Sequence, residues 1–234
     1  MMCGVELPHP LDVACALREG RLVEDVVIDA LLSDASRLVS ATYWTPVAVA
    51  RLAADWISAA HARRVLDVGS GVGKFCLVAA LASELRVTGV EQRAHLVTEA
   101  RRLAAQLGVE DRVEFAVGTL TDIDAASFDA LYVFNPFSEH LYPADARLDL
   151  SVEMSPERMA RDVAVLERVL DQMRIGAVFV TFHGFRGTIP DTFDLTRWER
   201  TEQSVLRLWT KAREHVGGFR WAEVDDDLTL VPQP

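Results

Sequence analysis

The stretch that decides the fold is RRVLDVGSGVGKFCLVAA, residues 63–80. A short apolar run leads to Asp67, a turn with Gly69, Gly71 and Gly73 follows, and an apolar segment of helical length comes next. This order predicts a buried strand, a tight turn and a helix. Backbone N–H groups in such a turn, together with the positive end of the helix dipole, favour an anionic or polar ligand.

Outward from this stretch, strand-like and helix-like segments alternate along the chain. Short strands are expected at 64–69, 86–91, 112–118, 128–136 and 176–185, and helices at 74–85, 93–108 and 155–173. The last helix has Ser155 and Pro156 as its start signal, and Gly108 closes the one before it. Such alternation predicts βαβ units, and therefore a doubly wound α/β fold with a mostly parallel, Rossmann-like sheet.

The two ends of the chain depart from this rhythm. Residues 1–60 are expected to form an N-terminal helical cap, with Thr45 as the N-cap of a helix that begins at Pro46. Residues 61–234 then form one compact domain, in which 185–215 is a substrate-side insertion. A helix is expected over 196–215, with Trp198 and Trp209 on one face, and closing strands over 220–232.

Composition excludes several classes of protein. The 24 basic residues are outnumbered by 35 acidic ones, which gives a net charge of −11 and argues against an extended nucleic-acid-binding face. No apolar run is long enough to span a membrane. Cys3, Cys15 and Cys76 are widely scattered, without the spacing of a metal site or a disulfide framework. A cytoplasmic protein without a metal is expected, and its oligomeric state stays open.

Two familiar phosphate-binding motifs do not fit the glycine turn. A P-loop needs four residues before its Gly-Lys pair and then Ser or Thr, but three residues precede Gly73-Lys74 here and Phe75 follows. A dinucleotide fingerprint would place its third glycine at position 74, which is Lys74.

The pattern that remains is D-x-G-x-G-x-G. Asp67 suits a ligand with an ammonium group, and the N–H groups of the turn suit a carboxylate. Glu91, at the end of the next strand, can accept hydrogen bonds from both hydroxyls of a ribose. Together these residues describe a nucleoside with an amino-acid tail.

The segments VLDVGSGVGKFCL and VTGVE resemble the S-adenosylmethionine-binding half of class I methyltransferases, over roughly residues 40–140. DVGSGVGK with GVEQ looks most like the non-SET, disruptor-of-silencing type of histone lysine methyltransferases. The resemblance implies S-adenosyl-L-methionine as the cofactor and an antiparallel last strand, which residues 220–232 would supply. It assigns cofactor-binding roles to Tyr43, Thr45, Asp67, Gly69, Ser70, Gly71, Gly73, Glu91, Gln92, Thr119, Leu120 and Asn135.

Within this resemblance, each part of the cofactor has its own contacts. Tyr43 and Thr45 lie in a loop that closes over the methionine end, and Gln92 lies beside the adenine. The third strand of the family often ends in Gly-Asp, whereas this chain has Gly118-Thr119. The hydrogen bond with the adenine is therefore expected from the Thr119 hydroxyl or from the backbone of Leu120.

The fourth expected strand ends in YVFNPF, and Asn135-Pro136-Phe137 resembles a shortened N-P-P-Y motif of amino-methylating enzymes. An amide oxygen and a constrained carbonyl can orient an N–H group so that its lone pair faces the methyl group. Asn135 is therefore the candidate catalytic residue, and Pro136 and Phe137 are candidate substrate contacts.

Two histidines near the same edge of the sheet, His140 and His183, are further candidate substrate-site residues. Their spacing with Glu139 matches no compact metal motif.

The expected reaction is methyl transfer from S-adenosylmethionine to an acceptor, preferably an amine or amide nitrogen of a small molecule or protein. An NAD(P)-dependent oxidoreductase and a non-catalytic nucleoside-binding protein are the alternatives.

Overall fold

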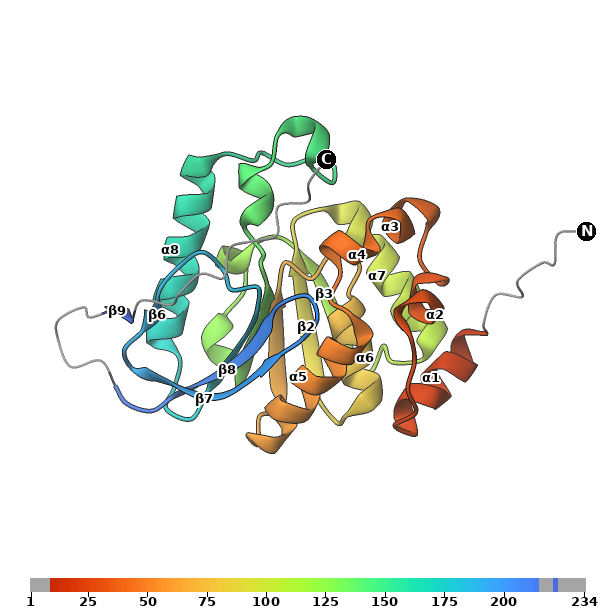
Figure 1. Ribbon diagram of the computed structural model, residues 1–234, viewed down its shortest axis with the longest axis horizontal. Helices are drawn as coiled ribbons and strands as arrows, with labels where there is room; N and C mark the ends of the chain where they lie inside the picture. Colours follow the sequence, from red (N-terminus) through yellow and green to blue (C-terminus); the bar gives the residue numbers. More distant parts are fainter. Residues whose placement is uncertain (1–8, 215–220, 223–234) are drawn as a thin grey trace, which may run out of the picture.

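The computed structural model describes residues 9–214 and 221–222, which are built around a central seven-stranded sheet (Figure 1). Its strand order is β3-β2-β1-β4-β5-β8-β7, and the first five strands in this order are parallel. The strands are β1 Arg64–Val68, β2 Arg86–Glu91, β3 Val113–Val117, β4 Ala130–Phe134, β5 Val178–Phe182, β7 Phe193–Arg200 and β8 Val205–Lys211. The expected α/β fold with a mostly parallel sheet is confirmed.

Helices cover both faces of the sheet. On one face, alternate strand residues such as Val65 and Val87 pack in a common core with the helices α1, α5, α6 and α7. On the other face, Leu66 and Leu131 pack against Leu166 and Leu170 of α8. The bounds of the long helices are α1 Pro10–Arg18, α5 Val47–Ala59, α6 Lys74–Ala82, α7 Ala94–Leu107 and α8 Pro156–Gln172.

Short helices fill the connections. Before α5 these are α2 Asp25–Asp29, α3 Asp34–Leu38 and α4 Ser40–Tyr43. The 3-10 turns are η1 Leu120–Asp122, η2 Ala125–Ser127, η3 Ser138–Leu141 and η4 Ala144–Ala146. The last two lie in the long connection from β4 to α8, which rises at the carboxyl end of the sheet in Figure 1.

The start of α5 differs from the sequence prediction. Pro46 is the N-cap residue, and the backbone N–H of Val47 donates to Asp25 Oδ1 at 3.0 Å. The Thr45 hydroxyl instead pairs with the Tyr132 hydroxyl, at 3.0 Å between the oxygens. Thr45 is therefore not an N-cap, because its side chain is committed to the buried strand β4.

The predicted helix over 196–215 was wrong, since most of this segment forms the antiparallel hairpin of β7 and β8. Strand β8 pairs with the free edge of β5, where Leu206 lies opposite Phe182. In the hairpin Trp209 is buried and opposite Leu195, whereas Trp198 is 62% exposed. The two tryptophans therefore share no helix face, and β8 with β7 supplies the antiparallel end of the sheet.

The expected strands over 220–232 lie outside the described residues, except for Trp221–Ala222. These two residues form β9, which pairs with β6 Ile189–Pro190 in a separate two-stranded sheet. Within the described part of the chain, no helix combines the length and apolarity that crossing a membrane requires.

Candidate functional site

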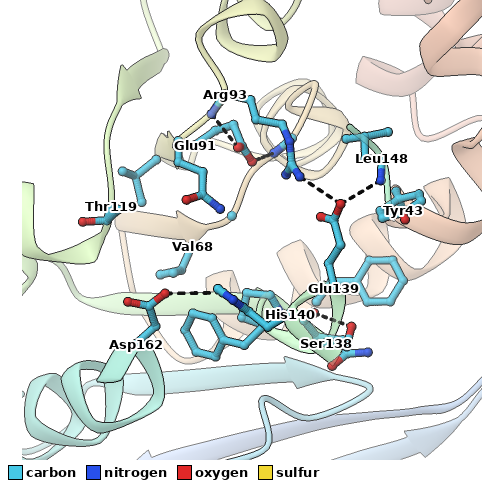
Figure 2. Close-up of a pocket in the computed structure, with 18 of the residues that line it drawn as sticks. Tyr43, Val68, Glu91, Arg93, Thr119, Ser138, Glu139, His140, Leu148 and Asp162 are labelled. Atoms are coloured by element: carbon cyan, nitrogen blue, oxygen red, sulfur yellow. Dashed lines mark hydrogen bonds and ion pairs between the residues drawn. The ribbon is translucent and has the colours of Figure 1, made fainter. Parts of the chain in front are cut away.

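A cavity opens where the parallel strands β1 to β4 end (Figure 2). Its other walls come from residues 42–44, from the β4–α8 connection and from Asp162 and Val165 of α8. It brings together eleven of the predicted site residues: Tyr43, Gly69, Gly71, Glu91, Gln92, Thr119, Leu120, Asn135, Pro136, Phe137 and His140. Strand ends from distant parts of the sequence therefore meet in one place, as open α/β sheets allow.

Two glycines of the turn allow other segments to pack closely against it. Gly71 has φ +54°, and a Cβ on it would lie 2.4 Å from the ring of Trp44. Gly69 has φ +78°, and a Cβ there would lie 3.2 Å from Pro136 Cβ. Side chains at positions 69 and 71 would clash with Pro136 and Trp44. Packing therefore requires glycine at both positions, as would a ligand bound close to the backbone of the turn.

Thr45 and Asp67 are not among the residues that line the cavity. Thr45 is held by Tyr132, and Asp67 is buried on the same side of the sheet, where Cys76 Sγ donates to its Oδ2 at 3.2 Å. Burial is the main reason that the pKa of Asp67 rises to about 7. The expected contact of Asp67 with an ammonium group is therefore not supported by its position.

Ser70, Gly73 and His183 also lie outside the cavity lining. A Cβ on Gly89 would lie 2.6 Å from Ser70 Oγ, so the Ser70 side chain points toward strand β2. Gly73 begins α6 with φ +77°, against the ring of Phe115. His183 stacks on Phe134 at 5.3 Å between ring centroids, and burial lowers its pKa.

Glu91 is fixed at the end of β2 by two backbone hydrogen bonds. Its Oε2 accepts from the N–H of Gly71 at 3.1 Å, and its Oε1 accepts from the N–H of Arg93 at 2.8 Å. Burial raises the pKa of Glu91, while these hydrogen bonds and the Arg93 charge act in the opposite direction. The carboxylate is thus held in a single orientation between the glycine turn and the cavity (Figure 2).

A buried ion pair joins the end of β2 to the β4–α8 connection. Arg93 Nη2 lies 2.8 Å from Glu139 Oε1, and Arg93 Nε lies 3.1 Å from Asp149 Oδ1. Glu139 Oε1 also accepts from the backbone N–H of Leu148 at 2.7 Å. We call residues 137–154 the roof, because this network folds them over the cavity (Figure 2).

Tyr43 ties the N-terminal wall to the roof. Its hydroxyl donates to the carbonyl of Ala146 at 3.0 Å. Burial, with the nearby Glu139 charge, raises the pKa of Tyr43 to about 12, so the hydroxyl remains a donor. This neutral hydrogen bond therefore holds the N-terminal wall to the roof, while the ion pair of Arg93 holds the end of β2 to the roof.

A second chain of polar contacts joins α8 to the wall of the cavity. His140 Nδ1 accepts from the N–H of Ser155 at 3.3 Å, and its Nε2 lies 3.5 Å from Asp162 Oδ2. Arg158 lies between this carboxylate and Gln92, with Nε 3.4 Å from Asp162 Oδ2 and Nη2 2.8 Å from Gln92 Oε1. His140 thus accepts a hydrogen bond from Ser155 and lies beside Asp162 in the lining of the cavity.

Asn135 stands directly after β4, with an unusual φ of +42°. Its backbone N–H donates to the carbonyl of Phe182 at 3.2 Å, and its carbonyl accepts from the Ser138 hydroxyl. Its side-chain Oδ1 is buried and has no hydrogen-bond partner within the described residues. An acceptor atom left unpaired in this way is costly unless a ligand supplies a donor.

Thr119 begins the short turn η1. Its N–H and its hydroxyl both donate to Asp122 Oδ2, at 2.8 and 3.0 Å. Asp122 itself is not among the residues that line the cavity, whereas Thr119 is.

Sequence reasoning missed Arg93, Glu139 and Asp162 as parts of the site. Arg158 and Asp162 have the i,i+4 spacing of a helical ion pair, which was a usable signal. Among the residues that the structure describes, no group of three or more His, Cys, Asp or Glu side chains is placed to hold a metal ion.

The family of the chain follows from its sequence. Residues 60–195 match the family model of the methyltransferase domain, and the chain belongs to this family. The match covers the strands β1 to β5, the glycine turn, the roof and α8.

Solved structures of methyltransferases share the fold. An RNA methyltransferase from Salinibacter ruber in complex with S-adenosyl-L-homocysteine is 21% identical, with a TM-score of 0.52 over 72% of this chain and 96% of that one. A methyltransferase from Geobacter sulfurreducens is 21% identical, with a TM-score of 0.56 over 85% and 97%. An O-methyltransferase from Bacillus cereus is 14% identical, with a TM-score of 0.56 over 86% and 97%. The histone lysine methyltransferase subtype is not among these findings.

Proposed function

We propose that this methyltransferase transfers the methyl group of S-adenosylmethionine to an amine or amide nitrogen of a small molecule or protein. The observation that carries the proposal is Asn135, which lines the same cavity as Glu91 and whose side-chain Oδ1 is buried without a hydrogen-bond partner among the described residues. The first group suits an N–H donor, and the second suits the hydroxyls of a ribose.

The residues present fit S-adenosylmethionine. Glu91 is oriented by Gly71 and Arg93, and either carboxylate oxygen keeps a lone pair for a ribose hydroxyl. Gly69 and Gly71 would bind near the methionine end, while Gln92, Thr119 and Leu120 would flank the adenine. The solved relatives from Salinibacter ruber and Bacillus cereus, which hold S-adenosyl-L-homocysteine, support this assignment.

The cofactor supplies an electrophilic methyl group on a cationic sulfur. The protein's part is to orient the acceptor, and Asn135 Oδ1 would accept a hydrogen bond from its N–H group. This leaves the nitrogen lone pair directed at the methyl group. Pro136 and Phe137 would contact the acceptor beside it.

The experiment compares cofactor binding with turnover. S-adenosylhomocysteine should raise the thermal unfolding temperature, whereas NAD should not. Glu91→Gln should weaken S-adenosylhomocysteine binding by about 1–3 kcal/mol in calorimetry. A shift with NAD alone would favour the oxidoreductase alternative, and binding of S-adenosylhomocysteine without turnover of any nitrogen acceptor would favour a binding protein.

The variant Asn135→Ala separates cofactor binding from orientation of the acceptor in the same experiment. It should leave the affinity for S-adenosylhomocysteine nearly unchanged and lower the methylation rate on the order of 100-fold, because the acceptor nitrogen loses its orientation. Loss of cofactor affinity without a separate effect on rate would place Asn135 in the cofactor site instead. An oxygen acceptor with an unchanged rate in this variant would contradict nitrogen transfer.

A further inference from the structure

Strand β7 forms one edge of the seven-stranded sheet (Figure 1). Seven of its eight residues are exposed, and these include Leu195 and Trp198. Trp198 is 62% exposed, whereas Trp44, Trp56 and Trp209 are buried. Within the part of the chain that the structure describes, no strand pairs with the outer side of β7. The strand therefore presents an exposed aromatic side chain and an open backbone edge together.

The backbone of β7 alternates in direction, as in any antiparallel ladder. The N–H of Thr201 donates to the carbonyl of Ser204 at 2.8 Å, in the register of the β7–β8 hairpin. Hydrogen-bonded positions of such a hairpin alternate along the strand. Glu199 and Arg197 therefore bond to β8, and the N–H and C=O groups of Trp198 point away from it. Trp198 thus offers one donor and one acceptor to a further strand.

The charged side chains on either side of Trp198 have opposite signs. Arg197 stacks over the ring of Trp56, with its guanidinium 4.6 Å from the ring centroid, and Glu199 lies on the same face of the strand. Neither has an ion-pair partner among the described residues. An edge strand whose charges share one sign repels every copy of itself, which protects against aggregation. A strand with both signs can instead be neutralised by a partner with the complementary order.

A second copy of β7 has this complementary order when it runs antiparallel about a two-fold axis through Trp198. Arg197 of each copy then lies opposite Glu199 of the other, and the two Trp198 side chains lie together on the opposite face. Registers shifted by two residues put the axis on Arg197 or on Glu199, so that one charge would face its own copy. Like charges in directly opposite positions are destabilising. The register centred on Trp198 therefore satisfies both the backbone and the charges.

We infer that β7 is an interface at which two copies of this chain pair edge to edge, antiparallel, with Trp198 on the two-fold axis. The sheet would then continue from one copy into the other. The bulge between Leu195 and Arg197 limits the regular pairing to a short segment, so the contact belongs to the weak, concentration-dependent class. The inference does not depend on the proposed methyl transfer, because β7 contributes no residue to the lining of the cavity.

Sedimentation at physiological salt measures the association. The mass of the wild-type protein should rise above that of a monomer between about 5 and 200 µM. Arg197→Glu and Glu199→Arg should each weaken the dimer roughly 10- to 30-fold, because each change puts like charges opposite each other. The controls Arg63→Glu and Glu110→Arg reverse exposed charges outside β7 and should leave the association unchanged. A wild-type monomer throughout this range overturns the inference, as does equal weakening in the controls.

A mixture of the two variants tests the register. Arg197→Glu leaves two acidic side chains at positions 197 and 199, and Glu199→Arg leaves two basic ones. Across the proposed axis, the mixed pair sets opposite charges against each other at both places. The mixture should therefore associate roughly 10-fold more tightly than either variant alone, which also shows that both variants are folded. A mixture that associates no better than its components contradicts the inferred register.

Amide exchange followed by NMR shows whether the contact lies at the edge itself. The N–H of Trp198 should exchange more slowly as the concentration of wild-type protein rises, because it gains an acceptor from the other copy. The N–H of Glu199 is bonded to β8 at every concentration and serves as the internal control. Full protection of Trp198 in the dilute monomer would mean that another part of the same chain covers β7. Either this result or an exchange rate of Trp198 that does not change with concentration overturns the inference.

Discussion

Asp67 shows how one residue of the glycine-turn motif serves the fold. Its carboxyl group is buried beneath the turn against Cys76, and its pKa rises to about 7. In the unfolded chain an aspartate ionises near pH 4. Between these two values the unfolded chain gives up a proton that the folded protein retains. The free energy of unfolding therefore falls as the pH rises from about 4 to about 7.

Asp67→Asn should remove this dependence while keeping the shape and an oxygen acceptor for Cys76. Relative to wild type, the free energy of unfolding of the variant should increase by up to about 4 kcal/mol between pH 4 and pH 7.5, since three pKa units correspond to this value. Urea denaturation across this range measures the difference. Parallel pH profiles for the two proteins would show that Asp67 is ionised in the folded state.

At the scale of elements, the parallel half of the sheet was predictable and the hairpin was not. Strand β2 occupies residues 86–91, as expected, because a buried parallel strand is an apolar run bounded by polar residues. In 196–215 the apolar residues fit helical spacing and strand alternation equally well. Pairing of β8 with the open edge of β5 decides between them, and this contact is not visible in local sequence.

The functional site, like the sheet, was predictable only in part. The places of Glu91 and Asn135 in the cavity lining were predictable, because Glu91 ends a strand, Asn135 directly follows one, and strand ends meet at one edge of a parallel sheet. Arg93 and Glu139 lie 46 residues apart in the chain, and their contact depends on the path of the roof. No short motif encodes such a path.

Glu139→Leu should loosen the roof. Arg93 would keep only Asp149, and the N–H of Leu148 would lose its acceptor. Loss of one partner of a buried ion pair costs about 3–5 kcal/mol. We expect faster dissociation of S-adenosylhomocysteine in a stopped-flow chase and earlier proteolytic cleavage within 142–150. Asp194→Asn, which breaks the exposed pair with Arg213, is the control and should change neither rate.

At the scale of the whole molecule, the N-terminal helices are bound to the sheet domain by a buried lysine. Lys74 Nζ, in the first turn of α6, lies 2.5 Å from Asp25 Oδ1 and 2.7 Å from Asp29 Oδ1. Asp25 also caps α5, and Ser40 accepts from the same ammonium group. Trp44, from the N-terminal helical segment, packs against Gly71. The position of this segment therefore shapes one wall of the cavity.

We therefore expect residues 9–60 and the sheet domain to unfold as one cooperative unit. Native-state hydrogen exchange should give the same opening free energy for peptides covering 25–43 and 64–91. Lys74→Met should lower the opening free energy of both peptides by roughly 3 kcal/mol, because two carboxylates lose their cation. The loss is not larger because Asp25 is half exposed. Adding Asp29→Asn to this variant should restore part of the loss. Early exchange confined to 25–43 in the wild-type protein would show instead that the cap opens independently, and that Trp44 leaves the cavity wall without unfolding the domain.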